Sequence, residues 1–150
     1  METLLRSVLQ EKADQLSDKG HILFWTAPDT PMAEAVRMMD EGNVGCLLVM
    51  DAGRLVGLLN ERDVIRGLSA HGAALGDKPV SDVMSVKPVS VSPSMSVYQA
   101  MVECTERRAR HLPVLEDGEL LGLISIGDLV RLVAKDKEKR ISDLMGYIQG

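Results

Sequence analysis

The side chains best suited to chemistry lie in the segment Gly122-Leu-Ile-Ser125-Ile-Gly-Asp128, where a predicted strand gives way to a predicted helix. The free N–H groups and the positive dipole at the start of a helix hold a phosphate without full neutralisation of its charge. Ser125 would add a hydroxyl donor, and the Asp128 carboxylate can accept hydrogen bonds from both ribose hydroxyls. The segment therefore indicates a nucleotide site, because the ribose contact selects a nucleoside over bare phosphate.

Two basic residues, Arg110 and His111, stand at the start of the strand that precedes this segment. Arg110 is the stronger candidate for a phosphate ligand, because a guanidinium binds phosphate oxygens in a bidentate fork at any physiological pH. His111 would contribute as a hydrogen-bond donor or as a cation. A Ser-x-x-Asp sequence at a helix start is also a capping pattern that stabilises a fold without any ligand. Asp128 taken alone fits either role equally well, and its combination with the two basic residues favours binding.

The motifs of common enzyme classes are absent from the sequence, which has no G-x-S-x-G, no P-loop G-x-x-x-x-G-K and no H-E-x-x-H. The three histidines, His21, His71 and His111, belong to unrelated segments. Cys46 and Cys104 stand apart, without the paired spacing of a metal site. We therefore expect a protein that is not an enzyme, binds no metal and requires no cofactor.

The charge balance is acidic, with 17 Lys and Arg against 22 Asp and Glu and a net charge of −5. No general electrostatic field draws such a chain to nucleic acid or to anionic lipid, and an aromatic content of 3% leaves few side chains for base stacking. No apolar run is long enough to span a bilayer, and the N-terminus is too charged for a signal peptide. Together with the isolated cysteines, these features predict a cytoplasmic protein without nucleic-acid or membrane partners.

An internal repeat organises the chain. Leu23–Leu68 aligns with Pro88–Val133 without a gap, and many of the non-identical pairs exchange one apolar residue for another. The identical pairs include Pro28 with Pro93, Ala35 with Ala100, Gly53 with Gly118, Gly57 with Gly122 and Asp63 with Asp128. Such self-similarity predicts two copies of one supersecondary unit.

Hydrophobic periodicity predicts the same first half for each copy, a short strand followed by a helix. The strands are expected over residues 22–26 and 89–91. Each helix carries apolar residues at i, i+3, i+4 and i+7, which is the stripe of a half-buried helix. The two stripes are Met32, Ala35, Val36 and Met39 in the first copy, and Val97, Ala100, Met101 and Cys104 in the second.

Two apolar runs and a second helix complete each copy. The runs, 46–59 and 112–124, are broken at Gly53 and at Gly118, and glycine supplies the positive φ that a tight hairpin turn needs. A β-α-β-β-α unit of this kind cannot cover its own sheet. We therefore predict a mixed α/β (α+β) fold in which the two repeats pack against each other by pseudo-twofold symmetry, with helical flanks at both ends.

The segments outside the two units are expected to flank or connect them. The predicted boundaries are an N-terminal helical flank over 1–15, a first repeat over 16–71, a linker over 72–79, a second repeat over 80–135 and a C-terminal tail over 136–150. Glycine and alanine around the linker predict a flexible crossing, and Val80, Val83 and Met84 predict a docked segment after it. Leu5, Val8 and Leu9 predict an amphipathic N-terminal helix, and KDKEKR (135–140) predicts a solvated charge run.

The sequences RHLPVLEDGELLGLISIGDLVRLV (110–133) and GCLLVMDAGRLVGLLNERDVIRGL (45–68) resemble the second half of a CBS domain. VSDVMS (80–85) is similar to the segment that precedes a CBS repeat, and MGYIQG (145–150) is similar to the tails of small stand-alone CBS-pair proteins. The resemblance implies a Bateman module, in which two CBS domains form two clefts and two modules pair into a flat dimer. It also implies that the clefts bind adenine nucleotides.

The same resemblance implies roles for residues of the second repeat. Asp128 would bind the ribose, and Arg110 and His111 would bind the phosphate. The adenine is expected between apolar walls that include Val83, Met84 and Leu112, with backbone groups near Val89–Ser92, including Val91, binding its edge.

The first repeat departs from this pattern. Asn60 stands in place of the serine, and a glycine and a cysteine replace the two basic residues. Asp63 remains as a candidate for the ribose, while Arg62 is equally well explained as a phosphate ligand or as a solvated helix residue. We therefore predict one competent cleft, in the second repeat, and one doubtful cleft in the first.

The sequence as a whole leads us to expect a homodimeric sensor that binds AMP, ADP or ATP and responds through its differential affinity for two states. NAD and S-adenosylmethionine are alternative ligands. The alternative function is a ligand-free scaffold for dimerisation or protein interaction, in which the two aspartates only cap helices. The protein that would be regulated is not identified by the sequence.

Overall fold

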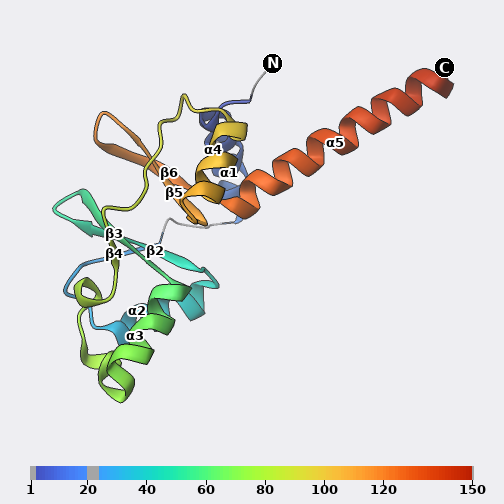
Figure 1. Ribbon diagram of the computed structural model, residues 1–150. Helices are drawn as coiled ribbons and strands as arrows, with labels where there is room; N and C mark the ends of the chain where they lie inside the picture. Colours follow the sequence, from blue (N-terminus) through green and yellow to red (C-terminus); the bar gives the residue numbers. More distant parts are fainter. Residues whose placement is uncertain (1–2, 20–23, 150) are drawn as a thin grey trace.

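The computed structural model describes residues 3–19 and 24–149 (Figure 1). The helices are α1 (Leu5–Lys19), α2 (Met32–Gly42), α3 (Glu61–His71), α4 (Val97–Glu106) and α5 (Ile126–Gln149). The strands are β1 (Trp25–Thr26), β2 (Cys46–Asp51), β3 (Arg54–Asn60), β4 (Ser85–Val86), β5 (His111–Glu116) and β6 (Glu119–Ser125). The start of the first predicted strand, Ile22 and Leu23, lies outside the described residues, as does His21.

The two repeats share a parallel pairing followed by an antiparallel hairpin, and the first sheet has β4 as a further strand beside β3. In the first, β1 runs parallel to β2, which forms an antiparallel hairpin with β3. In the second, Val91 makes a parallel bridge to Val114 of β5, and β5 forms the equivalent hairpin with β6. Both hairpins shift register at matching places, between Val49 and Met50 and between Val114 and Leu115. The predicted β-α-β-β-α order is confirmed.

Each hairpin turns on two residues with positive φ. These are Ala52 (φ 50°) and Gly53 (φ 78°) in the first repeat, and Asp117 (φ 52°) and Gly118 (φ 81°) in the second. Positive φ at both central residues is the geometry of the turn whose twist matches the two strands it joins. The prediction that Gly53 and Gly118 supply the positive φ of the hairpin turns is therefore confirmed.

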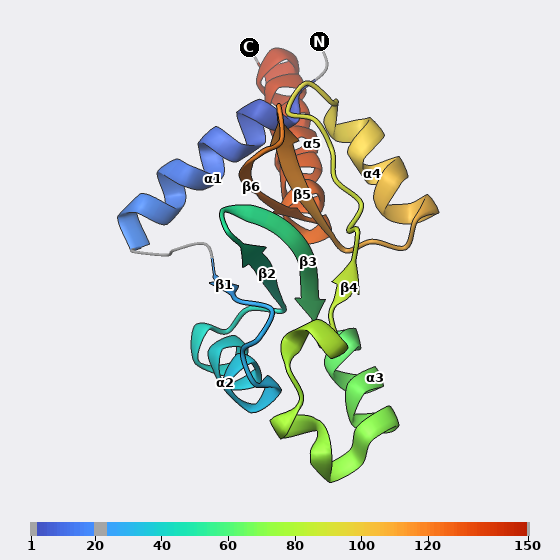
Figure 2. The ribbon, with the colours of Figure 1, turned by 90° about the vertical axis from the view of Figure 1, so that its left-hand side faces the viewer.

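Three apolar clusters hold the fold together. The predicted helix stripes supply two of them, with Met32, Ala35 and Met39 buried in the first repeat, and Val97, Ala100 and Cys104 buried in the second. The third cluster joins the repeats, because Leu48 and Leu58 of the first hairpin pack with Leu120 and Leu123 of the second. The hairpins face each other, and the helices lie on the outer sides (Figure 2). The expected packing of two half-covered sheets is confirmed.

The segment between the repeats is folded throughout, so the predicted flexible crossing is wrong, while the docked segment predicted around Val80 is confirmed. It forms two short 3-10 helices, Gly72–Asp77 and Val80–Asp82. Leu75 and Val80 are buried in the core of the first repeat, and this burial holds the segment against α2 and α3. Apolar contacts thus override the local preference of Gly and Ala for an irregular chain.

The N-terminal helix covers the second repeat. Leu5 and Val8 of α1 are buried in the same cluster as Leu129 of α5. The next turn of α1 lies on the sheet, because a Cβ at Gly122 of β6 would come within 2.7 Å of the Leu9 side chain. Helix α5 begins beside this hairpin and continues through the charge run at 135–140 as a single helix that projects away from the body (Figure 1).

Candidate functional site

The predicted Ser125 and Asp128 pair forms at the junction of β6 and α5. The Asp128 amide donates to Ser125 Oγ at 3.1 Å, and the Ser125 amide donates to Asp128 Oδ2 at 2.8 Å. This reciprocal arrangement is a capping box, in which the two residues satisfy amides at the start of a helix. The structural role considered for Asp128 is therefore present. It fixes the carboxylate at the positive end of α5.

Two cations bind the same carboxylate. Lys12 of α1 donates to Asp128 Oδ2 at 2.8 Å, and Arg131 donates to Asp128 Oδ1 at 2.7 Å. Lys12 also donates to the carbonyl of Leu123 at 2.8 Å. Burial alone would raise the pKa of Asp128, but the hydrogen bonds from Lys12 and Ser125 and the charge of Lys12 outweigh it and lower this pKa. Asp128 is thus ionised at neutral pH.

The two predicted phosphate ligands lie at the same end of the hairpin. His111 pairs with Ser125 across β5 and β6, and the carbonyl of Arg110 accepts a hydrogen bond from the amide of Ile126 at 2.8 Å. Burial lowers the pKa of His111, and the charge of Lys12 lowers it further, against the opposite effect of Asp128. His111 is therefore neutral at pH 7 and can donate or accept a hydrogen bond, while the exposed Arg110 supplies charge.

A cavity of about 300 Å³ opens between α1 and α5 beside Asp128. Its polar lining includes Lys12, Asp128 and Arg131, and its apolar lining includes Val8 and Leu132. This volume is at the lower end of the range for small-molecule sites, and a few polar groups on mostly apolar walls are typical of them.

The equivalent carboxylate of the first repeat is more enclosed. Asp63 is 3% exposed and forms a capping box with Asn60, whose side chain accepts from the Asp63 amide at 2.8 Å. Asp63 Oδ2 accepts from the Asn60 amide at 3.0 Å, and Asp63 Oδ1 accepts from the hydroxyl of Ser85 at 2.9 Å. Burial, and then the charge of Asp63, raise the pKa of the neighbouring Cys46 thiol to about 12.

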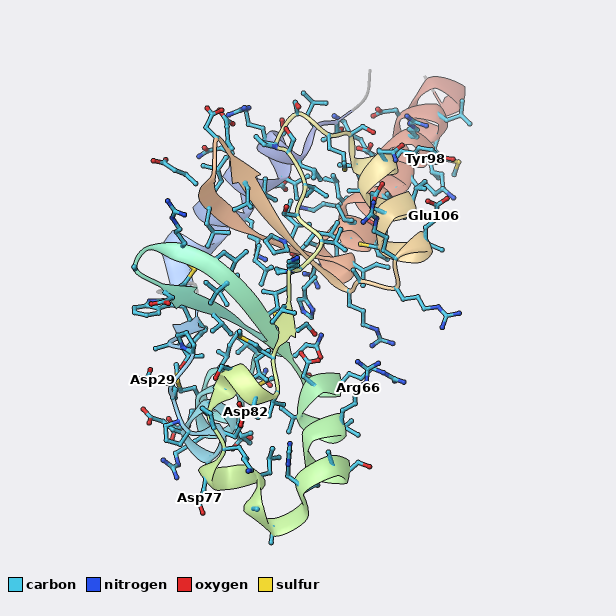
Figure 3. The ribbon with its side chains drawn as sticks, turned by 60° about the vertical axis from the view of Figure 1, so that its left-hand side comes forward. Asp29, Arg66, Asp77, Asp82, Tyr98 and Glu106 are labelled. Atoms are coloured by element: carbon cyan, nitrogen blue, oxygen red, sulfur yellow. The ribbon has the colours of Figure 1, made fainter. Side chains whose placement is uncertain are left out.

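Basic side chains are arranged differently around Asp63. Within the part of the chain that the structure describes, no Lys or Arg side chain forms an ion pair with it. Arg66, the repeat counterpart of Arg131, extends outward from α3 (Figure 3). Arg62 is exposed on the first turn of α3. The second repeat thus gathers cations at its carboxylate, and the first does not.

The apolar side chains predicted as adenine walls are divided between the two repeats. Strand β4 pairs with β3, so Met84 packs on Gly57 in the core of the first repeat, together with Val83. Leu112 is fully buried in the core of the second repeat. The chain entering the second repeat thus adds its strand to the sheet of the first, which places Met84 on the side of Asp63. The role of these side chains as adenine walls stays a prediction.

The backbone of Val91 is also engaged elsewhere. Its amide donates to the carbonyl of Pro113 at 3.0 Å, and its carbonyl accepts from the amide of Leu115 at 2.9 Å. Both groups are used in the parallel bridge to β5, so they are not free to bind the edge of a base. For the backbone groups of Val89, Ser90 and Ser92, contact with the edge of a base stays a prediction.

The sequence interpretation missed Lys12 and Arg131. A signal for Arg131 was present, because Asp128 and Arg131 are three residues apart on one helix face. Lys12 had no such signal, since its contact with Asp128 depends on how α1 packs on the second repeat.

Among the described residues, no group of three or more His, Cys, Asp or Glu side chains is placed to hold a metal ion. No described helix has the length and apolar character required to cross a membrane.

Comparison with known proteins gives one consistent family. The family model described as "CBS domain" matches residues 22–70 and again 80–135. The CBS domain-containing protein CBSX3, mitochondrial, of Arabidopsis thaliana is 36% identical over 153 residues, which cover 99% of this chain and 73% of the relative.

Two solved structures are similar over most of the chain. A putative signal-transduction protein with CBS domains from Burkholderia ambifaria MC40-6 has a TM-score of 0.80 and 36% identity, covering 89% of this chain and 96% of its own. The crystal structure of CBSX2 in complex with AMP has a TM-score of 0.67 and 29% identity, covering 77% of this chain and 90% of its own.

Proposed function

We infer the function from the premise that this chain belongs to the CBS-domain family, whose model matches both of its repeats. The resemblance found in the sequence is thereby confirmed. We propose that the protein is a regulatory module, without catalytic activity, that binds an adenine nucleotide in its second repeat. AMP, ADP and ATP are the proposed ligands, and the AMP complex of CBSX2 supports an adenine nucleotide in a related fold.

One observation carries this proposal. Asp128 is an ionised carboxylate fixed at the start of α5 and surrounded by basic side chains. A ribose needs an acceptor of this kind, and phosphates need cations and a helix N-terminus. Lys12, Arg131 and Arg110 supply charge, His111 supplies a neutral donor, and Ser125 supplies a hydroxyl. Val8 and Leu132 offer apolar walls for the base.

We propose unequal clefts. Asp63 is buried, and both of its oxygens already accept hydrogen bonds within the chain, from the Asn60 amide and the Ser85 hydroxyl. Both oxygens of Asp128 are engaged as well, but two of its partners, Lys12 and Arg131, are cations that can also bind a phosphate. Among the described residues, no Lys or Arg side chain pairs with Asp63. The site formed by Asp63, Asn60 and Met84, with Arg62 beside it, is therefore the weaker one.

We also propose that the module is a homodimer. Ile65 of α3 is 67% exposed and Val130 of α5 is 51% exposed, at equivalent positions of the two repeats. Two pseudo-symmetric helical faces with exposed apolar side chains suit self-association about a twofold axis. Sedimentation velocity tests this, and an Ile65→Asp variant should move the population toward monomer.

The alternative function is a ligand-free scaffold. It is favoured by the capping boxes of Asp63 and Asp128, which satisfy both side chains without a ligand. In that case the aspartates contribute only to stability, and removing them would weaken folding and change no binding.

Calorimetric titration separates the two functions. AMP, ADP, ATP, NAD and S-adenosylmethionine would each be titrated to millimolar concentration into the wild type, Asp128→Asn and Asp117→Asn. Asp117 is the control, because it lies in the turn at the other end of the hairpin and Asn tolerates its positive φ. We expect Asp128→Asn to abolish nucleotide binding and Asp117→Asn to retain it. If none of the five compounds gives a heat of binding with the folded wild type, the ligand-free scaffold is the function that remains.

We propose the cytoplasm as the location, since Cys46 and Cys104 are both free and buried. The name of one Arabidopsis relative places that protein in mitochondria, so fractionation of cells that express this chain is the direct test.

A further inference from the structure

We propose that Lys12 and Arg131 are exchange ligands of the second-repeat site: they bind the Asp128 carboxylate in the free protein and move to the phosphates when a nucleotide binds its ribose there. The site would then take a phosphorylated nucleoside in preference to adenosine or S-adenosylmethionine. This inference rests on the proposed nucleotide function and names the feature of the ligand that the site selects.

The first step concerns the acceptors of Asp128. Oδ2 accepts from the Ser125 amide and from Lys12, and Oδ1 accepts from Arg131. A carboxylate offers about four acceptor positions, and the fold needs the one used by the Ser125 amide. Three positions are occupied, so the two ribose hydroxyls can both bind the carboxylate only by displacing at least one of the two cations.

The second step concerns the displaced cations. The Lys12 side chain is only 28% exposed and lies beside the apolar Val8, and without Asp128 its ammonium keeps only the carbonyl of Leu123, which carries no full charge. A partly buried charge without a partner is costly. A phosphate on the same ligand restores the lost partner. Adenosine brings no anion, and the single carboxylate of S-adenosylmethionine comes with two cationic groups, a sulfonium and an ammonium.

The third step concerns reach. Lys12 and Arg131 come from different helices and line the same cavity, so a small displacement of either side chain leaves it in contact with a ligand held at Asp128. Lys135 lines this cavity as well, but it lies 3.6 Å from Glu11 and already has an acidic partner. Arg131 is 75% exposed and free to follow the phosphate.

A purely structural role for Lys12 predicts something different. If its ion pair only ties α1 to the second repeat, its loss should weaken every ligand to the same extent. If Lys12 is a phosphate ligand, its loss should weaken phosphorylated ligands alone, and adenosine should bind equally well or better because a competitor for Asp128 is gone.

The experiment is calorimetric titration of adenosine, AMP and ATP into the wild type, Lys12→Met and Arg6→Met. Methionine keeps the length and the apolar stem of lysine. Arg6 is the matched control, because it lies on the same helix and pairs with Glu116, away from the cavity. We expect Lys12→Met to weaken ATP about tenfold, as the loss of one charged hydrogen bond does. AMP, as a phosphorylated ligand, should weaken in the same direction. The affinity of Lys12→Met for adenosine and the affinities of Arg6→Met for all three compounds should not fall.

An unchanged ratio of ATP to adenosine affinity in Lys12→Met would overturn the exchange while leaving the nucleotide function intact. A wild type that binds none of the three compounds would overturn both. Should Lys12→Met not fold, Arg131→Met replaces it, since the exposed Arg131 is not needed for packing. The same loss of the ATP preference is expected there, and a retained preference would reject the proposal.

Discussion

The ion pair between Lys12 and Asp128 predicts how firmly α1 is held to the second repeat. Lys12→Met removes the bonds to Asp128 and to the carbonyl of Leu123 but keeps the aliphatic stem. Fully exposed pairs contribute about 0–1 kcal/mol, and breaking a fully buried pair costs about 3–5 kcal/mol. The two side chains are 28% and 13% exposed, so an intermediate loss of about 2 kcal/mol is expected. That loss lowers the Tm of a domain of this size by roughly 4–8 °C.

The pH dependence of this loss tests its cause. The pKa of Asp128 is lowered in the folded protein, so the stability gained from its charge is complete above the unfolded pKa of about 3.9. It disappears as the pH falls through the lower folded pKa. The difference in stability between the wild type and Lys12→Met should therefore be constant near neutral pH and shrink below about pH 4.

Urea denaturation followed by circular dichroism at several pH values measures these differences. Arg6→Met is again the control, because the Arg6 and Glu116 side chains are 61% and 42% exposed and their pair should contribute little. In an Asp128→Asn background the cost of Lys12→Met should fall by about half or more, since only the bond to Leu123 is left. An equal cost in both backgrounds, or an equal cost for Arg6→Met, would refute the reasoning.

Three further outcomes are expected. Cys46 should resist thiol reagents in the folded protein at pH 8 and react on unfolding, because burial and Asp63 raise its pKa to about 12. Labelling of Cys46 in the folded protein as fast as an exposed thiol is labelled would contradict this. Leu75→Ala should cost about 2–4 kcal/mol in urea denaturation, since the side chain is 7% exposed, whereas a flexible linker would make the change neutral. Gly118→Val should reduce the free energy of unfolding by at least the roughly 1–2 kcal/mol cost of a left-handed residue, because of strain at φ 81°. Thermal denaturation should show this as a lower Tm, and an unchanged Tm would show that the turn relaxes.

Local patterns in the sequence determined most of the fold. Met32, Ala35 and Met39 of the predicted helix stripe are buried as its period required, although its fourth member, Val36, is exposed. The hairpin glycines have the positive φ that the turns demanded. The capping box of Ser125 and Asp128 spans three residues, so its geometry follows once the helix forms. Interactions of this kind are fixed by the backbone geometry of one element, and spacing along the chain is enough to predict them.

Tertiary packing alone decided the surroundings of the candidate site. Lys12 reaches Asp128 because α1 lies on the second hairpin, and Met84 packs in the first repeat because β4 pairs with β3. Each of these contacts joins residues far apart in sequence, and each depends on which apolar faces bury each other. That choice is a competition between packings of the whole chain, so the sequence determined the two repeats and their caps, and only the folded structure determined which residues surround each carboxylate.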